Sequence, residues 1–299
     1  MRLPVLRSAL ALLLSALVLA LLACVIDFRE SAAMLRMLPA TSLAPALVLT
    51  GLVYIAGGFR FASFVERVAR VGPYDAIRLN FALALATHAL GILSDTIRIR
   101  YLMRRYGMAL SVSISASIAD RLLSTWLLAW GLFLLLPFAP GTPLALGGFV
   151  LLLLGLTVGW LLAHAKFWPA WLRTPLSFFA RSVMDRRLLG RQVALQSSIV
   201  LAVGAMLWLL ARALGADLSL LTSIAFAPAA LLATVVPFTY AGLGARETVF
   251  AIGLPLFAPV TPESAVALSL GLGGCFLIGS LPGVFTLFSI LKAPLSPEG

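Results

Sequence analysis

Val235-Val-Pro-Phe-Thr-Tyr-Ala-Gly-Leu-Gly-Ala-Arg-Glu247 interrupts an apolar region with a proline, two glycines and two adjacent opposite charges. Pro237 breaks a helix because it lacks an N–H and clashes with the preceding turn. Gly242 and Gly244 allow the backbone to bend and to approach other groups closely. Apolar sequence on both sides predicts that the bend lies at membrane depth, where irregular backbone must be covered by protein or line a water-filled cavity. Charges such as those of Arg246-Glu247 are costly there and indicate a functional site.

The overall composition is that of a helical protein with many membrane spans. Of the 299 residues, 62% are hydrophobic and only 11% are charged, which excludes a soluble globular protein. Long runs of Leu, Ala and Val stand in place of the short alternating strands of a β-barrel. The net charge is +11, carried mainly by arginines between the apolar runs. They predict cytoplasmic loops that face anionic lipid, and they argue against nucleic-acid binding.

The apolar segments predict an all-α integral membrane protein with about seven or eight transmembrane helices, forming a single polytopic domain over residues 1–299. Seven crossings are expected at residues 8–26, 43–59, 120–137, 144–162, 192–210, 219–236 and 265–291. An eighth results if the short segment 248–257 completes a crossing. Gly279, Pro282 and Gly283 predict a kink in the last segment.

Two segments, 79–95 and 237–258, predict re-entrant or broken helices. The first is short and is followed directly by arginines at positions 98, 100, 104 and 105. A full crossing would place these arginines outside the cell, against the positive-inside rule. A segment that returns to the cytoplasmic side removes the conflict. The alternative is an ordinary short span with an exceptional loop.

Basic residues also orient the chain. Arg2 and Arg7 place the N-terminus in the cytoplasm, and we expect the protein in the plasma membrane, the inner membrane of a bacterium. A signal peptide is the alternative for the first apolar run, but its length favours a retained span. Arg60 follows the second span and marks a cytoplasmic loop. Residues 164–191, rich in basic and Trp residues, serve either as a cytoplasmic anchor or as a site for a specific lipid.

The sequence carries no motif for cofactor or metal chemistry. It has no P-loop, HExxH, CxxC or GxSxG, so we expect no cofactor, no metal and no enzyme activity. Cys24 and Cys275 lie in apolar runs and predict neither a disulfide nor a metal site. His88 precedes Asp95 by seven residues, or two helical turns. It is either a proton relay or an intramembrane histidine with satisfied hydrogen bonds.

The bend after Pro237 resembles a family motif. Pro237-x3-Ala-Gly-Leu-Gly-x-Arg-Glu247 is similar to Pro-x3-Gly-Gly-Leu-Gly-x-Arg-Glu of the lysylphosphatidylglycerol-synthase transmembrane, or flippase-like, family, with Ala241 replacing the first glycine. An earlier stretch resembles the family's other motif, which runs Asn, Pro-x3-Gly-Glu/Asp-x2-Arg, Gly and an acid-Arg pair. The matching residues are Asn80, Asp95, Arg98, Gly107 and Asp120-Arg121, with Leu90 and Ser94 at the proline and glycine positions.

The two motifs form a weak internal repeat. Each places an acid and an arginine near a bend, Asp95 with Arg98 and Glu247 with Arg246. Paired interrupted segments in two halves of a chain indicate a transport site. The sequence leaves open whether the two repeats have opposite orientations.

The resemblance implies lipid translocation rather than lipid synthesis. In two-domain lysylphosphatidylglycerol synthases, a separate soluble domain transfers the aminoacyl group, and this chain ends soon after its last apolar segment. The resemblance therefore implies flippase-like transport of a polar, anionic or aminoacylated lipid headgroup, with a phospholipid or lipid-linked substrate as partner. One alternative is an accessory subunit of a membrane glycosyltransferase or lipid-modifying enzyme. Another is an integral enzyme, for which no nucleophile or metal set is recognisable.

The predicted substrate site brings both bends to one cavity near mid-membrane. Arg98 and Arg246 are expected to hold the lipid phosphate, because a guanidinium group matches its geometry. Asp95 and Glu247 hold these arginines in place or meet a cationic headgroup. Alternatively, each acid-arginine set only locks its own bend. Pro237, Gly242 and Gly244 form one wall of the predicted cavity, and His88, Asp120 and Arg121 are further candidates.

Overall fold

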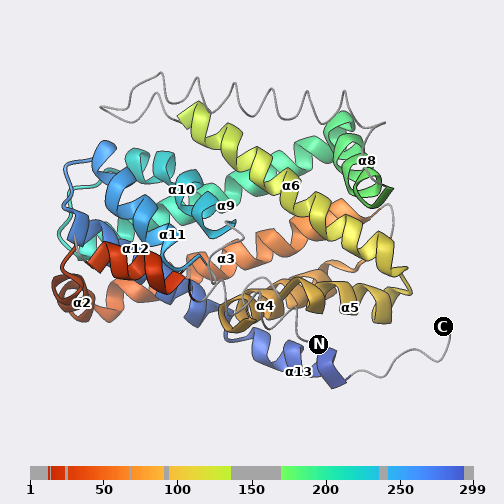
Figure 1. The fold of residues 1–299 in the computed structure, drawn as a ribbon, viewed down its shortest axis with the longest axis horizontal. Coiled ribbons are helices and arrows are strands. Elements are labelled where there is room, and N and C mark those ends of the chain that lie inside the picture. The colour runs from red at the N-terminus through yellow and green to blue at the C-terminus, as the bar shows by residue number, and fades with distance from the viewer. Residues whose placement is uncertain are drawn as a thin grey trace.

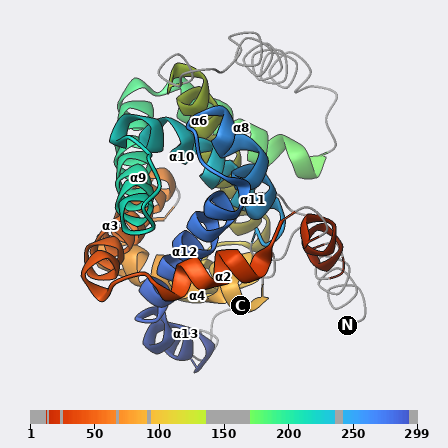
Figure 2. The same cartoon turned by 90° about the vertical axis from the view of Figure 1, so that its left-hand side faces the viewer.

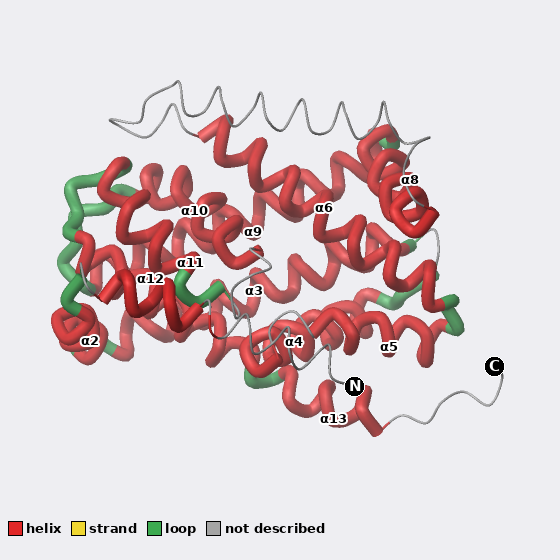
Figure 3. Tube along the Cα trace, viewed as in Figure 1, coloured by secondary structure: helices red, strands yellow, loops and turns green. Residues whose placement is uncertain are grey.

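The computed structural model of the chain is built from helices (Figures 1 and 3). It describes residues 13, 15–23, 26–66, 69–90, 94–135, 170–235 and 242–292, and no strand occurs among them. The first helices are α2 (Phe28–Arg36), α3 (Ala40–Val65), α4 (Pro73–Leu90), α5 (Ser94–Tyr106) and α6 (Leu110–Leu135). They are followed by α8 (Ala170–Met184), α9 (Arg186–Ala213), α10 (Leu220–Val235) and α11 (Ala245–Thr248). The π-helix η4 (Val249–Gly253), the 3₁₀ helix η5 (Leu254–Leu256), α12 (Pro262–Ser280) and α13 (Gly283–Lys292) complete the order.

Four of the described helices, α3, α6, α9 and α12, are long and apolar enough to cross a membrane. The longest, α9, has 28 residues and extends about 42 Å. The all-helical prediction is confirmed, whereas seven or eight crossings are not. The predicted span 144–162 lies outside the described residues. The predicted crossing 219–236 is instead one arm of a hairpin, because α10 ends at Val235 and Gly242 already packs back against Thr234.

Two of these long helices, α3 and α9, pack side by side in opposite directions at the centre of the molecule. At one end, Arg191 near the start of α9 pairs with Glu66, just after α3, at 3.3 Å. Further along, the Thr50 hydroxyl lies 3.7 Å from Met206 Sδ. Large side chains of α9 and α10, among them Met206 and Phe226, are fully buried in this core. Residues such as Leu201 and Phe285 are exposed, as expected for surfaces in contact with acyl chains.

The first predicted broken helix forms a hairpin of α4 and α5, termed hairpin 1. At its open end, the Tyr106 hydroxyl donates to Asp75 Oδ2 at 3.0 Å. Burial, reinforced by this hydrogen bond to Asp75, raises the pKa of Tyr106, so the hydroxyl remains a donor at neutral pH. At the closed end, the Thr87 hydroxyl donates to Ser94 at 2.9 Å. The chain therefore returns to the end from which it came, which is the geometry that a re-entrant segment requires.

The second predicted broken helix also forms a hairpin, termed hairpin 2, in which α10 is followed by α11, η4 and η5. Near its closed end, Gly242 packs against the backbone of Thr234. Farther from that end, the Phe226 ring contacts the rings of Phe250 and Phe257, with centroids 5.0 and 5.3 Å apart. The returning part of the hairpin, α11, η4 and η5, thus packs along α10. Of the segment predicted as 237–258, residues 242–258 are described and belong to this hairpin.

The two hairpins enter the molecule from opposite ends. Hairpin 1 follows the C-terminal end of α3, and hairpin 2 follows the C-terminal end of the antiparallel α9. In Figure 1, α5 therefore lies toward the right of the molecule, whereas α10 and α11 lie toward the left. This answers the question that the sequence left open, because two halves in opposite orientations form an inverted repeat.

The helices of the two halves correspond in order and spacing. The series α3, α4, α5, α6 recurs as α9, α10, α11 with η4, and α12. The starts of α4 and α10, Pro73 and Leu220, are 147 residues apart, and so are Leu90 and Pro237. The halves also exchange packing partners, because α6 packs on α10 and α12 packs on α4.

A glycine lies at the same place in both halves, where the hairpin touches its preceding span. A Cβ atom added to Gly58 of α3 would lie 2.6 Å from the Cα atom of Ile77 in α4. A Cβ atom added to Gly204 of α9 would lie 2.6 Å from the Cα atom of Ile224 in α10. Only glycine permits these backbones to approach so closely, as at other helix contacts in membranes.

The remaining helices complete the two ends of the molecule. Helix α2 lies across one end, as Figure 2 shows, and its Ser31 hydroxyl donates to the Glu263 carbonyl at the start of α12 at 3.0 Å. At Leu281 and Pro282 the chain breaks between α12 and α13, which confirms the predicted kink. Helix α13 then packs along α4, toward the end that carries the ion pair of Arg191.

Candidate functional site

Three charged residues meet between α3, α5 and α6, and they are termed the Asp120 cluster. Arg60 Nη1 lies 3.1 Å from Asp120 Oδ1, and Arg98 Nη1 lies 3.0 Å from Asp120 Oδ2. The Asp120 side chain is 2% exposed and each arginine side chain is 12% exposed. Since each helix contributes one residue, the cluster ties hairpin 1 to the spans on either side of it.

The Asp120 cluster holds more positive than negative charge. Two guanidinium groups share one carboxylate, and the Arg98 guanidinium also lies 4.6 Å from the centre of the Phe61 ring. The Nε atoms of Arg60 and Arg98 are buried with no hydrogen-bond partner among the described residues. Buried charges are stabilised only when they are paired and hydrogen-bonded. The cluster is therefore suited to receive a further anion.

Arg60 does not lie in a loop, contrary to the prediction. It belongs to the last turns of α3, which continues to Val65. The side chain can enter the protein because Asp120 provides its counter-ion, and Gln192 of α9 donates to its carbonyl at 3.0 Å. A sequence gives no sign of such a partner, which comes from another helix 60 residues away.

The acids and arginines of the first motif pair across helices rather than along them. Arg121 Nε lies 2.7 Å from Asp95 Oδ2, so Asp95 faces Arg121 of α6 and not Arg98 as predicted. Asp120 and Arg121 do not pair with each other, because Asp120 binds Arg60 and Arg98 whereas Arg121 binds Asp95. The side chains of the Asp95–Arg121 pair are 21% and 41% exposed, so this pair is more accessible than the Asp120 cluster.

The second motif forms a separate group, the Glu247 cluster, made of Arg246, Glu247 and Ser269. Arg246 Nη2 lies 2.9 Å from Glu247 Oε1. The Ser269 hydroxyl of α12 donates to the same carboxylate oxygen and accepts from Arg246 Nε, both at 3.0 Å. Arg246 is 4% exposed and Glu247 is fully buried. The three side chains thus close a ring of hydrogen bonds without surplus charge.

The Glu247 cluster also fixes the bend of hairpin 2. Glu247 Oε2 accepts from the Gly244 N–H at 2.7 Å, and Gly242 O accepts from the Arg246 N–H at 2.9 Å. Gly242 and Gly244 have φ angles of +80° and +85°, which glycine adopts without strain. Pro237 lies outside the described residues. Glu247 thus contacts both its neighbour Arg246 and the backbone of the bend.

The four predicted substrate residues are divided between two places. Among the described residues, no ion pair or hydrogen bond joins Asp95 or Arg98 to Arg246 or Glu247. The described residues therefore form two separate charged groups, one in each half of the molecule.

Two residues of the charged clusters were missed by the sequence analysis. Arg60 was assigned to a loop, and Ser269 was not noticed in the apolar segment that forms α12. A serine that is fully buried in such a helix needs a polar partner, which is the one signal that could have indicated it. Among the described residues, no group of three or more His, Cys, Asp or Glu side chains is placed to hold a metal ion.

Comparison with known proteins agrees with the two motifs and with the helical fold. Residues 8–283 match the family described as the lysylphosphatidylglycerol synthase TM region. The chain matches no curated protein and no solved structure. The match spans most of the chain, including both hairpins and both charged clusters. The chain therefore belongs to the lysylphosphatidylglycerol synthase transmembrane family.

Proposed function

We propose that this protein moves the polar, anionic headgroup of a phospholipid across the plasma membrane of a bacterium, without changing the lipid chemically. Membership of the family indicates a membrane protein concerned with lipid modification or transport. The observation that favours transport is the Asp120 cluster, in which two arginines share one buried carboxylate inside an inverted pair of hairpins. Inverted repeats with interrupted helices at a central charged site are typical of transporters.

In this proposal Arg60 and Arg98 receive the lipid phosphate. Both have an Nε–H donor without a hydrogen-bond partner among the described residues, and guanidinium groups bind phosphate in a bidentate manner. Asp120 keeps the two arginines together in the absence of lipid. The acyl chains remain in the bilayer while the headgroup passes the cluster.

Arg246 has a different role in this proposal from the one that its motif suggested. Its guanidinium is engaged by Glu247 and Ser269, and a Cβ atom at Gly273 would collide with it. The Glu247 cluster holds the bend of hairpin 2 in shape so that its closed end can face hairpin 1.

The purified protein reconstituted in liposomes tests the proposal. Fluorescent phosphatidylglycerol is placed in both leaflets, and a quencher is added outside. The lipid of the inner leaflet is quenched only after it crosses to the outer leaflet, and we expect the protein to accelerate this quenching. Arg98→Gln should slow this movement about tenfold or more, as expected for the loss of a charge-assisted contact to phosphate. Arg100→Gln removes an exposed arginine from the same helix and should have no effect.

The outcomes separate the proposal from its alternatives. Movement that requires an added membrane enzyme would favour an accessory subunit, and a changed lipid mass would favour an integral enzyme. If Arg98→Gln is folded and moves lipid at the rate of the unchanged protein, the assignment of the phosphate to the Asp120 cluster is wrong.

A further inference from the structure

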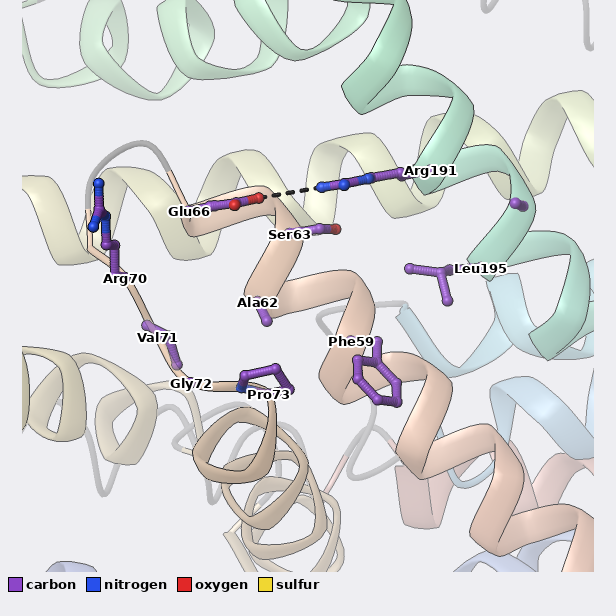
Figure 4. Close-up of a pocket in the computed structure, with 11 residues that line it drawn as sticks. Phe59, Ala62, Ser63, Glu66, Arg70, Val71, Gly72, Pro73, Arg191 and Leu195 are labelled. Carbon is purple, nitrogen blue, oxygen red and sulfur yellow. Dashed lines mark hydrogen bonds and ion pairs between the residues drawn. The ribbon is translucent and has the colours of Figure 1, made fainter.

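A cavity of about 620 Å³ opens at the end of the molecule where α3 ends and α9 begins. Figure 4 shows its wall, formed by one stripe of α3 and the loop that leads to α4. Phe59, Ala62 and Leu195 supply an apolar part, whereas Glu66, Arg70 and Arg191 stand at its rim. Arg60, Arg98 and Asp120 are not among the residues that line it, so it is separate from the Asp120 cluster.

A second hollow of about 680 Å³ continues from the polar rim. It shares Ser63, Glu66, Arg70 and Arg191 with the first cavity and adds Asp185 and Arg187. Asp185 Oδ1 accepts hydrogen bonds from the N–H groups of Arg187 and Leu188 as the N-cap of α9. Three arginines therefore face two acids, Glu66 and Asp185, which leaves one positive charge in surplus.

The order of polarity along the cavity matches that of a phospholipid. Glu66 lies at the end of α3, and Phe59 lies seven residues earlier, about 10 Å deeper along the helix. A headgroup at the arginines would thus have its acyl chain beside Phe59 and Leu195. Arg191 can exchange its partner readily, because its 3.3 Å pair with Glu66 joins side chains that are 66% and 62% exposed. Exposed ion pairs of this kind are weak.

The inverted repeat provides an internal comparison. At the opposite end of the molecule, the α9–α10 loop corresponds to the α3–α4 loop, and Asp217 takes the place of Arg70. The start of α3, which corresponds to the start of α9, carries Ala40 and Ala44 instead of Arg187 and Arg191. The arginines are therefore not a consequence of the fold, since the equivalent positions of the other half lack them.

We infer that this cavity binds one anionic phospholipid from the leaflet on the arginine-rich side, with its phosphate among Arg70, Arg187 and Arg191 and one acyl chain against Phe59 and Leu195. The inference does not rest on the proposed transport, because the site shares no residue with the Asp120 cluster. It requires only that the protein spans a membrane.

Native mass spectrometry of the detergent-solubilised protein tests the inference, with phosphatidylglycerol and phosphatidylcholine of equal chain length as probes. We expect one phosphatidylglycerol to be retained in preference to phosphatidylcholine. The double variant R187Q/R191Q should bind it about tenfold more weakly. Arg100→Gln, which removes an exposed arginine from the middle of α5, should bind it as the unchanged protein does.

A second variant tests the apolar half of the cavity. Ala194→Trp fills the space beside Leu195 and should reduce retention of the lipid, whereas Val193→Trp on the neighbouring face should not. Soluble glycerophosphate should fail to compete, because it lacks an acyl chain. Equal retention of phosphatidylcholine, or unchanged binding by both R187Q/R191Q and Ala194→Trp in folded protein, would overturn the inference.

Discussion

The Asp120 cluster and the Glu247 cluster lie at related places in two halves of opposite orientation, yet they differ in how completely their charges are paired. In the first, two arginines from different helices share one carboxylate, and guanidinium nitrogens remain without a partner among the described residues. In the second, one arginine, one glutamate and one serine satisfy each other across a bend and α12. One cluster has surplus charge, and the other is closed.

This difference separates a candidate binding site from a structural one. A closed group of buried charges holds its conformation, and any ligand must first break hydrogen bonds that are already made. A group with spare donors offers them to an anion without such a loss. The two clusters should therefore respond differently when one member is removed.

The largest effect is expected for Asp120→Ala. It leaves two buried arginines without a counter-ion, and breaking a buried pair in this way costs about 3–5 kcal/mol. We expect a large fall in the midpoint of thermal unfolding in detergent. Asp217→Ala removes an exposed acid from the α9–α10 loop and serves as the control, with a change within about 0.5 kcal/mol.

The cause can be checked by removing the whole cluster. R60M/R98M/D120L should recover much of the stability, because no buried charge remains. If Asp120→Ala unfolds at the same temperature as the unchanged protein, the arginines reach solvent, and the surplus charge described for the Asp120 cluster does not exist.

A smaller but coupled effect is expected in the Glu247 cluster. Glu247→Gln and Arg246→Met should each destabilise the protein by about 2–3 kcal/mol, because each leaves the other side chain buried without its opposite charge. The double variant should lose less than the sum of the two single variants, with a coupling of at least about 1 kcal/mol. Additive losses in unfolding measurements would show that the two side chains do not act as a pair.

The sequence predicted the broken helices but not their orientation. Pro237, Gly242 and Gly244 indicate a bend from local chemistry alone, and the arginines after residue 95 indicate a return to the same side. The orientation of hairpin 2 depends on the direction of α9, which is fixed by packing against α3. A pattern of apolar residues carries no information about that direction. The same apolar pattern led to the prediction of a full crossing at residues 219–236, where the structure has α10.

The sequence predicted the residues of the site better than their partners. Arg246 and Glu247 are adjacent in the chain and carry opposite charges, so the sequence already indicated them as candidates for a pair. The pairs of Asp120 join α6 to α3 and α5, and such contacts between distant helices cannot be read from spacing. For the same reason Arg60, which adjoins a basic loop, was assigned to that loop.

An effect of intermediate size is expected for Gly244→Ala. The φ angle of +85° is unfavourable for alanine, which costs about 1–2 kcal/mol, and the new Cβ atom would press against Val18. Gly190→Ala is the matched control, because Gly190 lies in α9 with open space around it. There alanine should stabilise the helix by up to about 1 kcal/mol. Thermal unfolding of the two variants should therefore shift in opposite directions, and a parallel shift would contradict the bend described for hairpin 2.

The smallest effect on stability is expected for Asp95→Asn. Its partner Arg121 is 41% exposed at the side chain, and partly exposed ion pairs contribute about 0–1 kcal/mol.

Lipid movement in liposomes distinguishes a structural pair from a substrate contact. If Asp95 only positions Arg121, the exchange D95R/R121D restores the pair and should restore movement that Asp95→Asn has slowed. If Asp95 meets a cationic headgroup, the exchange should fail for an aminoacylated lipid, because an arginine now stands at position 95. Phosphatidylglycerol, which carries no cation, should then move equally well with Asp95→Asn and with the unchanged protein. A third outcome is that Asp95→Asn loses phosphatidylglycerol movement and the exchange does not restore it. Asp95 would then be as necessary for transport as the Asp120 cluster, and the distinction between that cluster and the Asp95–Arg121 pair would be wrong.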